Sequence, residues 1–214
     1  MDRYLLLSPE ERRVYCEQAA ADLGLPAASI EKDFWVCWIL KELFSLPGIG
    51  EHLTFKGGTS LSKGWGLIQR FSEDIDIVIS RSRFGVTNGP ERDSAKAWKQ
   101  YLEMLSEKTR DFIVNVLMSN FRDHLASHLP ESMQWKLIHE LDDSANEVVL
   151  FHYPPIFPEG GYLRPVVRIE PGARSDTVPT ERRPIEAFLT GLLKAESFLV
   201  RCVHPKRTFR SEER

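Results

Sequence analysis

The sequence predicts a mixed α/β or α+β domain, and three observations indicate that class. Apolar residues recur at helical spacing before residue 45, and short alternating runs follow residue 130. Between them, residues 52–80 have the pattern of a strand, a turn, a short helix and a second strand. Hydrophobic residues make up 42% of the 214 residues and charged residues 28%, which is enough apolar surface for a real core.

Two helices are expected at the start of the chain. Ser8 can cap the first helix, Pro9 suits its first position, and Glu11 completes a capping box. Gly24 ends this helix. The second helix is expected over about 29–44, where large apolar residues recur at helical spacing.

The middle and the end of the chain alternate between strands and helices. The run 74–80 (DIDIVIS) alternates and is rich in isoleucine, which is typical of a strand. The elements expected from residue 52 onward are strands at 52–56 and 74–80, a short helix at 59–66, a loop at 84–93, a long helix at 94–128, and strands at 133–141, 147–152 and 164–170.

Charge and cysteine content exclude several protein classes. Lys and Arg number 28 against 31 Asp and Glu, so the net charge of −3 excludes a histone-like protein but leaves room for a local basic groove. Apolar runs are shorter than the roughly 18 residues that span a bilayer, and the start lacks a signal-peptide pattern. The three cysteines lie far apart and predict neither a disulfide framework nor a zinc site. We expect a cytoplasmic protein with no membrane partner.

The densest functional signal lies in residues 55–77 (FKGGTSLSKGWGLIQRFSEDIDI). Asp74 and Asp76 are two positions apart on a predicted strand, so both carboxylates project from one face. Two such charges repel each other unless a cation bridges them. Mg²⁺ or Mn²⁺, which prefer oxygen ligands, are the natural bridging ions.

A phosphate-binding turn precedes this pair. Gly57 and Gly58 allow a tight turn, and Thr59 and Ser60 place hydroxyls and free N–H groups at a helix start. Lys63 follows one turn later and can neutralise a phosphate oxygen. A phosphate site facing a metal-binding carboxylate pair predicts phosphoryl or nucleotidyl transfer.

Either motif alone is common in proteins without such a function. Because they occur within 20 residues, with Arg70 and Ser72 beside the aspartates, the functional interpretation is favoured. The Walker pattern is excluded because its lysine would have to precede Ser or Thr, and Gly64 follows Lys63. A dinucleotide-binding pattern starting at Gly48 is excluded because Leu53 occupies its third glycine position.

The sequence resembles the AbiEii/AbiGii-type nucleotidyltransferase toxins, within the DNA polymerase β-like nucleotidyltransferase superfamily. The resemblance is carried by EKDFWVCWIL (31–40), the stretch 55–77, VVRIEPGARS (166–175) and HPKRTF (204–209). It implies a five-stranded mixed sheet with flanking helices, Mg²⁺, and transfer of a nucleotide from an NTP to an acceptor such as tRNA. It also implies a cognate antitoxin as partner.

Taken together, the residues and the resemblance assign two sets of site residues. The resemblance matches Ser72 to the serine that precedes the metal-binding aspartates. The nucleotide-binding set is Gly57, Gly58, Thr59, Ser60, Lys63 and Arg70, and the catalytic set is Asp74, Asp76, Ser72 and Glu170, of which Asp74, Asp76 and Glu170 would hold the metal.

Other polar residues have two interpretations. Glu170 ends an apolar strand, where superfamily members commonly place a third carboxylate, or it is an ordinary solvent-facing glutamate. Arg168 and Arg174 would contact phosphates or be solvated. His124 and His128 are four apart on the long helix and could bind metal, but no third ligand is near in sequence, so surface histidines are favoured.

Members of the family that this sequence resembles continue past the RTF stretch (residues 207–209) into a helical domain. This chain reads RTFRSEER from residue 207 onward. The expected organisation is a nucleotidyltransferase domain at 1–209, with N-terminal helices at 1–50, a catalytic core at 51–209, and a divergent tail at 210–214. The usual C-terminal helical domain is then missing, and the alternative function is a non-catalytic remnant that binds a nucleotide or a partner. An exposed apolar patch is expected from Phe188, Leu189, Leu192, Leu193, Phe198, Leu199, Val200, Val203 and Phe209.

Overall fold

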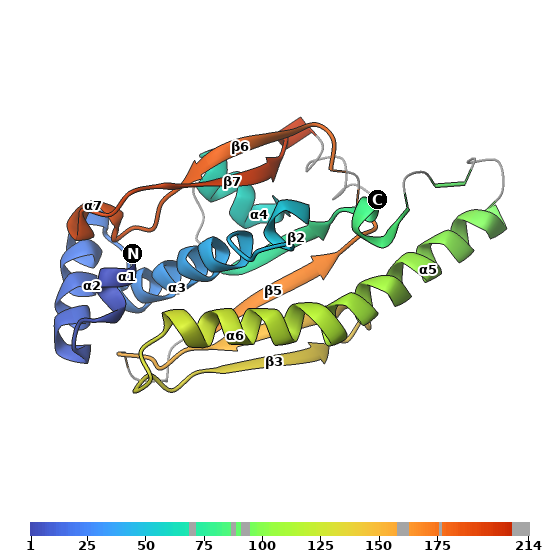
Figure 1. Cartoon of the computed structure of the whole chain (residues 1–214). Coiled ribbons are helices and arrows are strands. Elements are labelled where there is room, and N and C mark those ends of the chain that lie inside the picture. Colours follow the sequence, from blue (N-terminus) through green and yellow to red (C-terminus); the bar gives the residue numbers. More distant parts are fainter. Residues whose placement is uncertain (69–71, 87–88, 91–94, 158–162, 176, 207–214) are drawn as a thin grey trace.

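A mixed β-sheet crosses the centre of the molecule (Figure 1). The computed structural model describes residues 1–68, 72–86, 89–90, 95–157, 163–175 and 177–206. Within these residues the sheet has seven strands in the order β3-β4-β5-β2-β1-β7-β6. The strands are β1 (Leu53–Lys56), β2 (Asp74–Ile79), β3 (Lys136–Leu141), β4 (Glu147–His152), β5 (Val166–Gly172), β6 (Thr180–Ile185) and β7 (Phe198–Val203).

Helices lie across one face of this sheet (Figure 1). Helix α3 (Ala27–Phe44) lies over its centre, and the consecutive helices α5 (Ala95–Phe112) and α6 (Met118–His128) lie over the side of the sheet that contains β3. The π-helical turn η4 (Ile113–Leu117) joins α5 to α6 without a break. The helices are α1 (Asp2–Leu5), α2 (Pro9–Leu23), α3 (Ala27–Phe44), α4 (Gly57–Thr59), α5 (Ala95–Phe112), α6 (Met118–His128) and α7 (Thr190–Leu193), with 3₁₀ turns η1 (Gly50–His52) and η3 (Arg81–Phe84) and a π-turn η2 (Ser60–Gly64). In the described part of the chain, none of these helices has both the length and the apolar character needed to cross a membrane.

Helix α2 begins and ends where the sequence predicts, α3 begins two residues before the expected start, and α1 was not predicted. The Glu11 amide donates to Ser8 Oγ at 3.2 Å, and the Ser8 amide donates to Glu11 Oε2 at 2.8 Å, which is the expected capping box. Gly24 ends α2 in a left-handed conformation with φ +66°. The next helix, α3, is buried on nearly all sides because it lies between the sheet and its neighbours α2 and α6.

The core is formed where α3 packs on the sheet. Trp35 stacks on Tyr153 with ring centroids 5.2 Å apart, and it also contacts Phe151 of β4. From β2, Ile75 and Ile77 are fully buried, so the aspartates between and beside them face the other side of the sheet. The alternation predicted for 74–80 is therefore confirmed.

The mixed fold class is confirmed, but the five-stranded sheet implied by the resemblance is wrong in number, because β6 and β7 also belong to the sheet. Strand β6 is an edge strand with Glu181, Arg182 and Pro184 in its sequence. Charged residues and proline are tolerated there because one side of an edge strand forms no ladder hydrogen bonds. The expected helix at 59–66 is also wrong in form, since α4 is followed by a π-turn.

The predicted apolar patch is largely absent among the described residues of that set. The pairing of β7 with β1 and β6 buries Val200 and Val203, and Leu189 and Leu193 are buried at α7. Leu192 is 37% exposed and Leu199 is 62% exposed. The buried members are Leu189, Leu193, Val200 and Val203, the half-buried members are Phe188 and Phe198, and Phe209 lies outside the described residues together with the tail at 210–214.

Candidate active site

Two neighbouring parallel strands bring three carboxylates to one face of the sheet. Asp76 of β2 lies opposite Glu170 of β5, and Asp74 lies opposite Arg168. Residues opposite each other on adjacent strands project from the same face, as do residues two apart on one strand. Asp74, Asp76 and Glu170 therefore share a face, although the two motifs are far apart in the sequence.

Two of the three carboxylates are paired with cations. Lys56 Nζ is 3.3 Å from Asp76 Oδ1, and Arg168 Nε donates to Glu170 Oε1 at 2.7 Å. Lys56 lies opposite Asp76 in the antiparallel pairing of β1 and β2. Among the described residues, the carboxylate oxygens of Asp74, Asp76 and Glu170 do not form a group in which every ligand atom lies within 4.8 Å of the others.

Asp74 lies in a region of negative potential. Its pKa is raised above the ordinary aspartate value, first by burial and then by the negative charges of Glu170, Glu73 and Asp76, while Arg168 opposes the shift. The ionised form of Asp74 is therefore disfavoured in the folded protein. A cation bound at this face would favour that form.

The glycine turn lies directly against the aspartates. Gly57 has φ +74°, and a Cβ at this position would lie 1.9 Å from Asp76 Oδ2, so both the conformation and the space require glycine. Thr59 Oγ1 donates to the Asp74 carbonyl, which can only accept. Ser72 Oγ lies 2.7 Å from Thr59 Oγ1 and is therefore the donor in that contact. These bonds fasten the turn to the start of β2.

The next two predicted phosphate contacts face the protein interior. Ser60 is fully buried, and its hydroxyl forms no hydrogen bond with the described residues. Lys63 forms an ion pair with Asp33 of α3 and donates to the Glu186 carbonyl at 3.2 Å. Both side chains therefore support the turn from behind. Gly58 lies in α4 beside Gly57, whereas Arg70 lies outside the described residues.

The residues that hold Lys63 were missed in the sequence. Asp33 is buried, its Oδ2 accepts the Phe188 amide at 2.7 Å, and the Lys63 ammonium group lies 3.8 Å from the centroid of the Phe188 ring. The available signal was an aspartate directly before the apolar run 34–40 (FWVCWIL) of the expected helix. Such a residue must find a partner within the fold.

An open cleft of about 350 Å³ adjoins the carboxylates. Asp76 and Glu170 line it together with Lys56, Arg110 and Arg174. Arg110 pairs with Glu147 at 2.6 Å, and Arg174 donates to Ser106 Oγ at 2.9 Å. Lys56 and Arg110 were not singled out in the sequence, although Lys56 directly precedes the glycine turn. The cleft thus places cations and carboxylates where an anionic substrate and a metal would meet.

Comparison with known proteins agrees with this arrangement. The family described as nucleotidyl transferase AbiEii toxin, type IV toxin–antitoxin system, matches residues 38–210. No curated protein matches the chain. The matched residues contain the glycine turn, β2 and β5, and thus all three carboxylates. The family predicted from the sequence is confirmed: the chain belongs to the AbiEii family of nucleotidyl transferase toxins.

Proposed function

We propose that this chain transfers a nucleotide from a nucleoside triphosphate to an acceptor, with Mg²⁺ or Mn²⁺ held by Asp74, Asp76 and Glu170. The observation that carries the proposal is the register of β2 and β5, which puts all three carboxylates on one face. The raised pKa of Asp74 adds support, because excess negative charge at this face is what a divalent cation relieves.

The donor set fits such a cation. Carboxylate oxygens are the ligands that Mg²⁺ and Mn²⁺ prefer. When bound, the metal would supply electrostatic stabilisation of the attacking and leaving oxygens. Lys56 and Arg168, which neutralise Asp76 and Glu170 in the structure, are then available to contact phosphate oxygens.

The glycine turn is the proposed phosphate site. Gly57 and Gly58 let backbone approach the triphosphate beside Asp76, and Thr59 and Ser72 fix the turn on β2. Ser60, Lys63 and Arg70 complete the proposed nucleotide-binding set. Lys63 serves it by holding the turn from the interior through its ion pair with Asp33, and Ser60 serves it by packing in the interior behind the turn.

An RNA such as tRNA is the proposed acceptor, and a cognate antitoxin is the proposed partner. The cations that line the cleft, Lys56, Arg110 and Arg174, suit an acceptor rich in phosphate. Nucleoside triphosphates and tRNA meet in the cytoplasm, which is the location that this function requires.

The test is incubation of the protein with each labelled nucleoside triphosphate, Mg²⁺ and total RNA. We expect label to appear in RNA, and we expect Asp74→Ala and Asp76→Ala to lower transfer by orders of magnitude because the metal loses ligands. Asp22→Ala, which changes an exposed residue of α2, is the matched control and should transfer normally. Unchanged transfer in both site variants would overturn the proposal. Nucleotide binding with no transfer to any RNA or protein would instead favour a binding-only role.

A further inference from the structure

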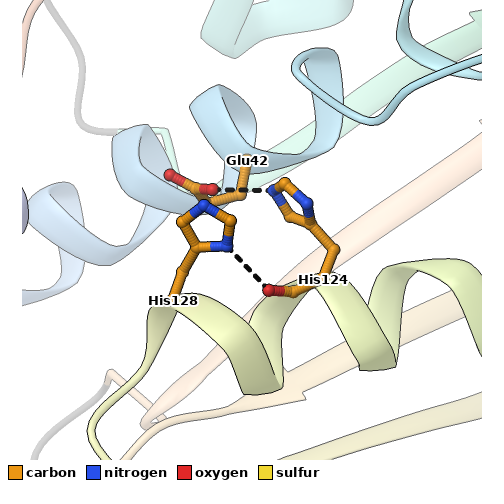
Figure 2. A group of neighbouring side chains, drawn as sticks. All are labelled: Glu42, His124 and His128. Carbon is orange, nitrogen blue, oxygen red and sulfur yellow. Dashed lines mark hydrogen bonds and ion pairs between the residues drawn. The ribbon is translucent and has the colours of Figure 1, made fainter.

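We propose a second metal site, for a transition-metal ion such as Zn²⁺, formed by Glu42 of α3 with His124 and His128 of α6. It is separate from the carboxylates of β2 and β5. Figure 2 shows the Glu42 carboxylate directed toward both imidazole rings. One ligand atom from each residue lies within 4.8 Å of the other two. This set of two histidines and one glutamate is a common protein ligand set for Zn²⁺.

Helix geometry brings the three side chains together. His124 and His128 are four residues apart, so they project from one face of α6, and their ring centroids are 4.3 Å apart. Glu42 comes from α3, which packs against α6, and its Oε2 is 2.9 Å from His124 Nε2. Zinc ligands at tetrahedral positions are roughly 3.3 Å apart. The Glu42–His124 pair is already near that spacing, and the His128 ligand atom lies within 4.8 Å of both. Because the carboxylate can only accept, His124 Nε2 carries a proton in the metal-free protein, and Zn²⁺ binding would release it.

The hydrogen bond of His128 selects the tautomer of its neutral ring that suits metal binding. Its Nδ1 lies 2.8 Å from the backbone carbonyl of His124, which can only accept, so Nδ1 carries the proton. In the neutral ring the lone pair then belongs to Nε2. Metal-binding histidines are typically oriented by such a bond from the other ring nitrogen.

The Glu42 carboxylate has capacity left for a cation. Its side chain is 2% exposed, and Oε2 faces His124. Oε1 lies 3.2 Å from Lys41 Nζ but receives no aligned hydrogen bond from the described residues, and that lysine also donates to Asp2 at 2.9 Å. A buried carboxylate in this position is stabilised by additional positive charge. The alternative role for the cluster is a simple hydrogen bond between Glu42 and His124 that holds the two helices together.

A metal here would fasten α3 to α6. Three protein ligands would leave one tetrahedral position open for a water molecule. Ser45 Oγ lies 3.4 Å from His124 Nε2. The same helix, α3, carries Lys32 and Asp33, which hold Glu73 and Lys63 next to the glycine turn and β2. The proposed role is therefore structural, and it supports the candidate active site from a distance.

The test is calorimetric titration of the metal-free full-length chain with Zn²⁺ in excess Mg²⁺, followed by Co²⁺ absorption spectroscopy. We expect one Zn²⁺ per chain, a rise in melting temperature on binding, and a Co²⁺ spectrum typical of tetrahedral nitrogen and oxygen ligands. His128→Ala should weaken Zn²⁺ binding by about 100-fold or more and abolish the rise. Because His128 is exposed and its hydrogen bonds to Ser127 and His124 stay within α6, this variant should fold normally.

Two controls keep the outcome unambiguous. His139 forms the same kind of contact with Glu147 Oε2, at 2.5 Å, and His139→Ala should keep the Zn²⁺ site. The double variant Asp74→Ala/Asp76→Ala should also keep it, which separates this proposal from the proposed function. Absence of saturable Zn²⁺ binding, retention of full affinity in His128→Ala, or a cobalt–thiolate absorption band from the cysteines would overturn the proposal.

Discussion

Gly57 and Asp76 are in direct contact: a Cβ on Gly57 would lie 1.9 Å from Asp76 Oδ2. The backbone of the turn therefore approaches the carboxylate as closely as the absence of a side chain allows. This contact couples the proposed phosphate site to the proposed metal site, and a single methyl group should disturb both.

Replacement of Gly57 by alanine is the most direct test of that coupling. Gly57→Ala should abolish nucleotide transfer and destabilise the fold by more than the roughly 1–2 kcal/mol expected for a left-handed alanine, because the methyl group also displaces Asp76. Gly48→Ala is the matched control: Gly48 has φ +71°, and a Cβ there meets nothing within 4 Å. This control variant should lose only the roughly 1–2 kcal/mol of unfolding free energy that a left-handed alanine costs, measured by urea denaturation. It should keep its transfer activity. Equal losses in the two variants would contradict the coupling.

Removal of the Asp74 charge should stabilise the fold while it inactivates the site. Burial and neighbouring carboxylates raise the pKa of Asp74, so folding is penalised once the pH exceeds the ordinary value of 3.8. We expect Asp74→Asn to unfold at higher urea than the wild type at pH 7, and the difference to shrink as the pH falls toward 3.8 and below. The exposed-site variant Asp22→Asn should show no such gain. A variant that is less stable than the wild type at pH 7 would argue against repulsion at this face.

Lys63 should contribute mainly through its buried ion pair. Lys63→Met leaves Asp33 buried without its cation, which typically costs about 3–5 kcal/mol of unfolding free energy. The double variant Lys63→Met/Asp33→Asn should recover much of that loss, because asparagine is neutral and still accepts the Phe188 amide. We expect nucleotide binding to recover together with stability. If stability returns while binding stays lost, Lys63 contacts the phosphate directly.

Glu31 should make stability depend on pH near neutrality. Burial raises its pKa from the usual 4.5 to about 7, against the opposing effect of its hydrogen bond from the Ile156 amide. The folded state thus holds this proton more tightly than the unfolded state. Its contribution is fully favourable below about pH 4.5 and declines as the pH rises to about 7, by about 3 kcal/mol in total. Urea denaturation between pH 4.5 and 8 should show a smaller decline in Glu31→Gln, and parallel profiles would rule this assignment out.

The sequence predicted the local features of the site because their signals are local. The spacing of Asp74 and Asp76 sets their common face once the strand forms, and the buried Ile75 and Ile77 confirm the strand. The family match covers this stretch, since it extends over residues 38–210. Strand β6 was missed because Pro184 and its charged neighbours resemble a loop unless the strand is known to be at an edge.

The partners of these residues could not be predicted because they depend on register and packing. Lys56 reaches Asp76 through the β1–β2 register, and Glu42 reaches His124 across two helices. The direction of the Lys63 side chain could also not be predicted, because residues 59–66 were expected to form an α-helix with Lys63 one turn after Thr59. The π-turn there has a wider repeat than an α-helix and rotates the side chains that follow.

The place of β1 between β2 and β7 has a consequence for the timing of activity during synthesis. β7 is made long after β1, yet Phe55 of β1 pairs with Cys202 of β7. The Glu186 carbonyl and the Phe188 ring that receive Lys63 are also late in the chain. While the polypeptide is still emerging from the ribosome, the strand that leads into the glycine turn therefore lacks one of its two neighbours. A nascent chain should therefore lack the proposed transfer activity until β7 has left the ribosome.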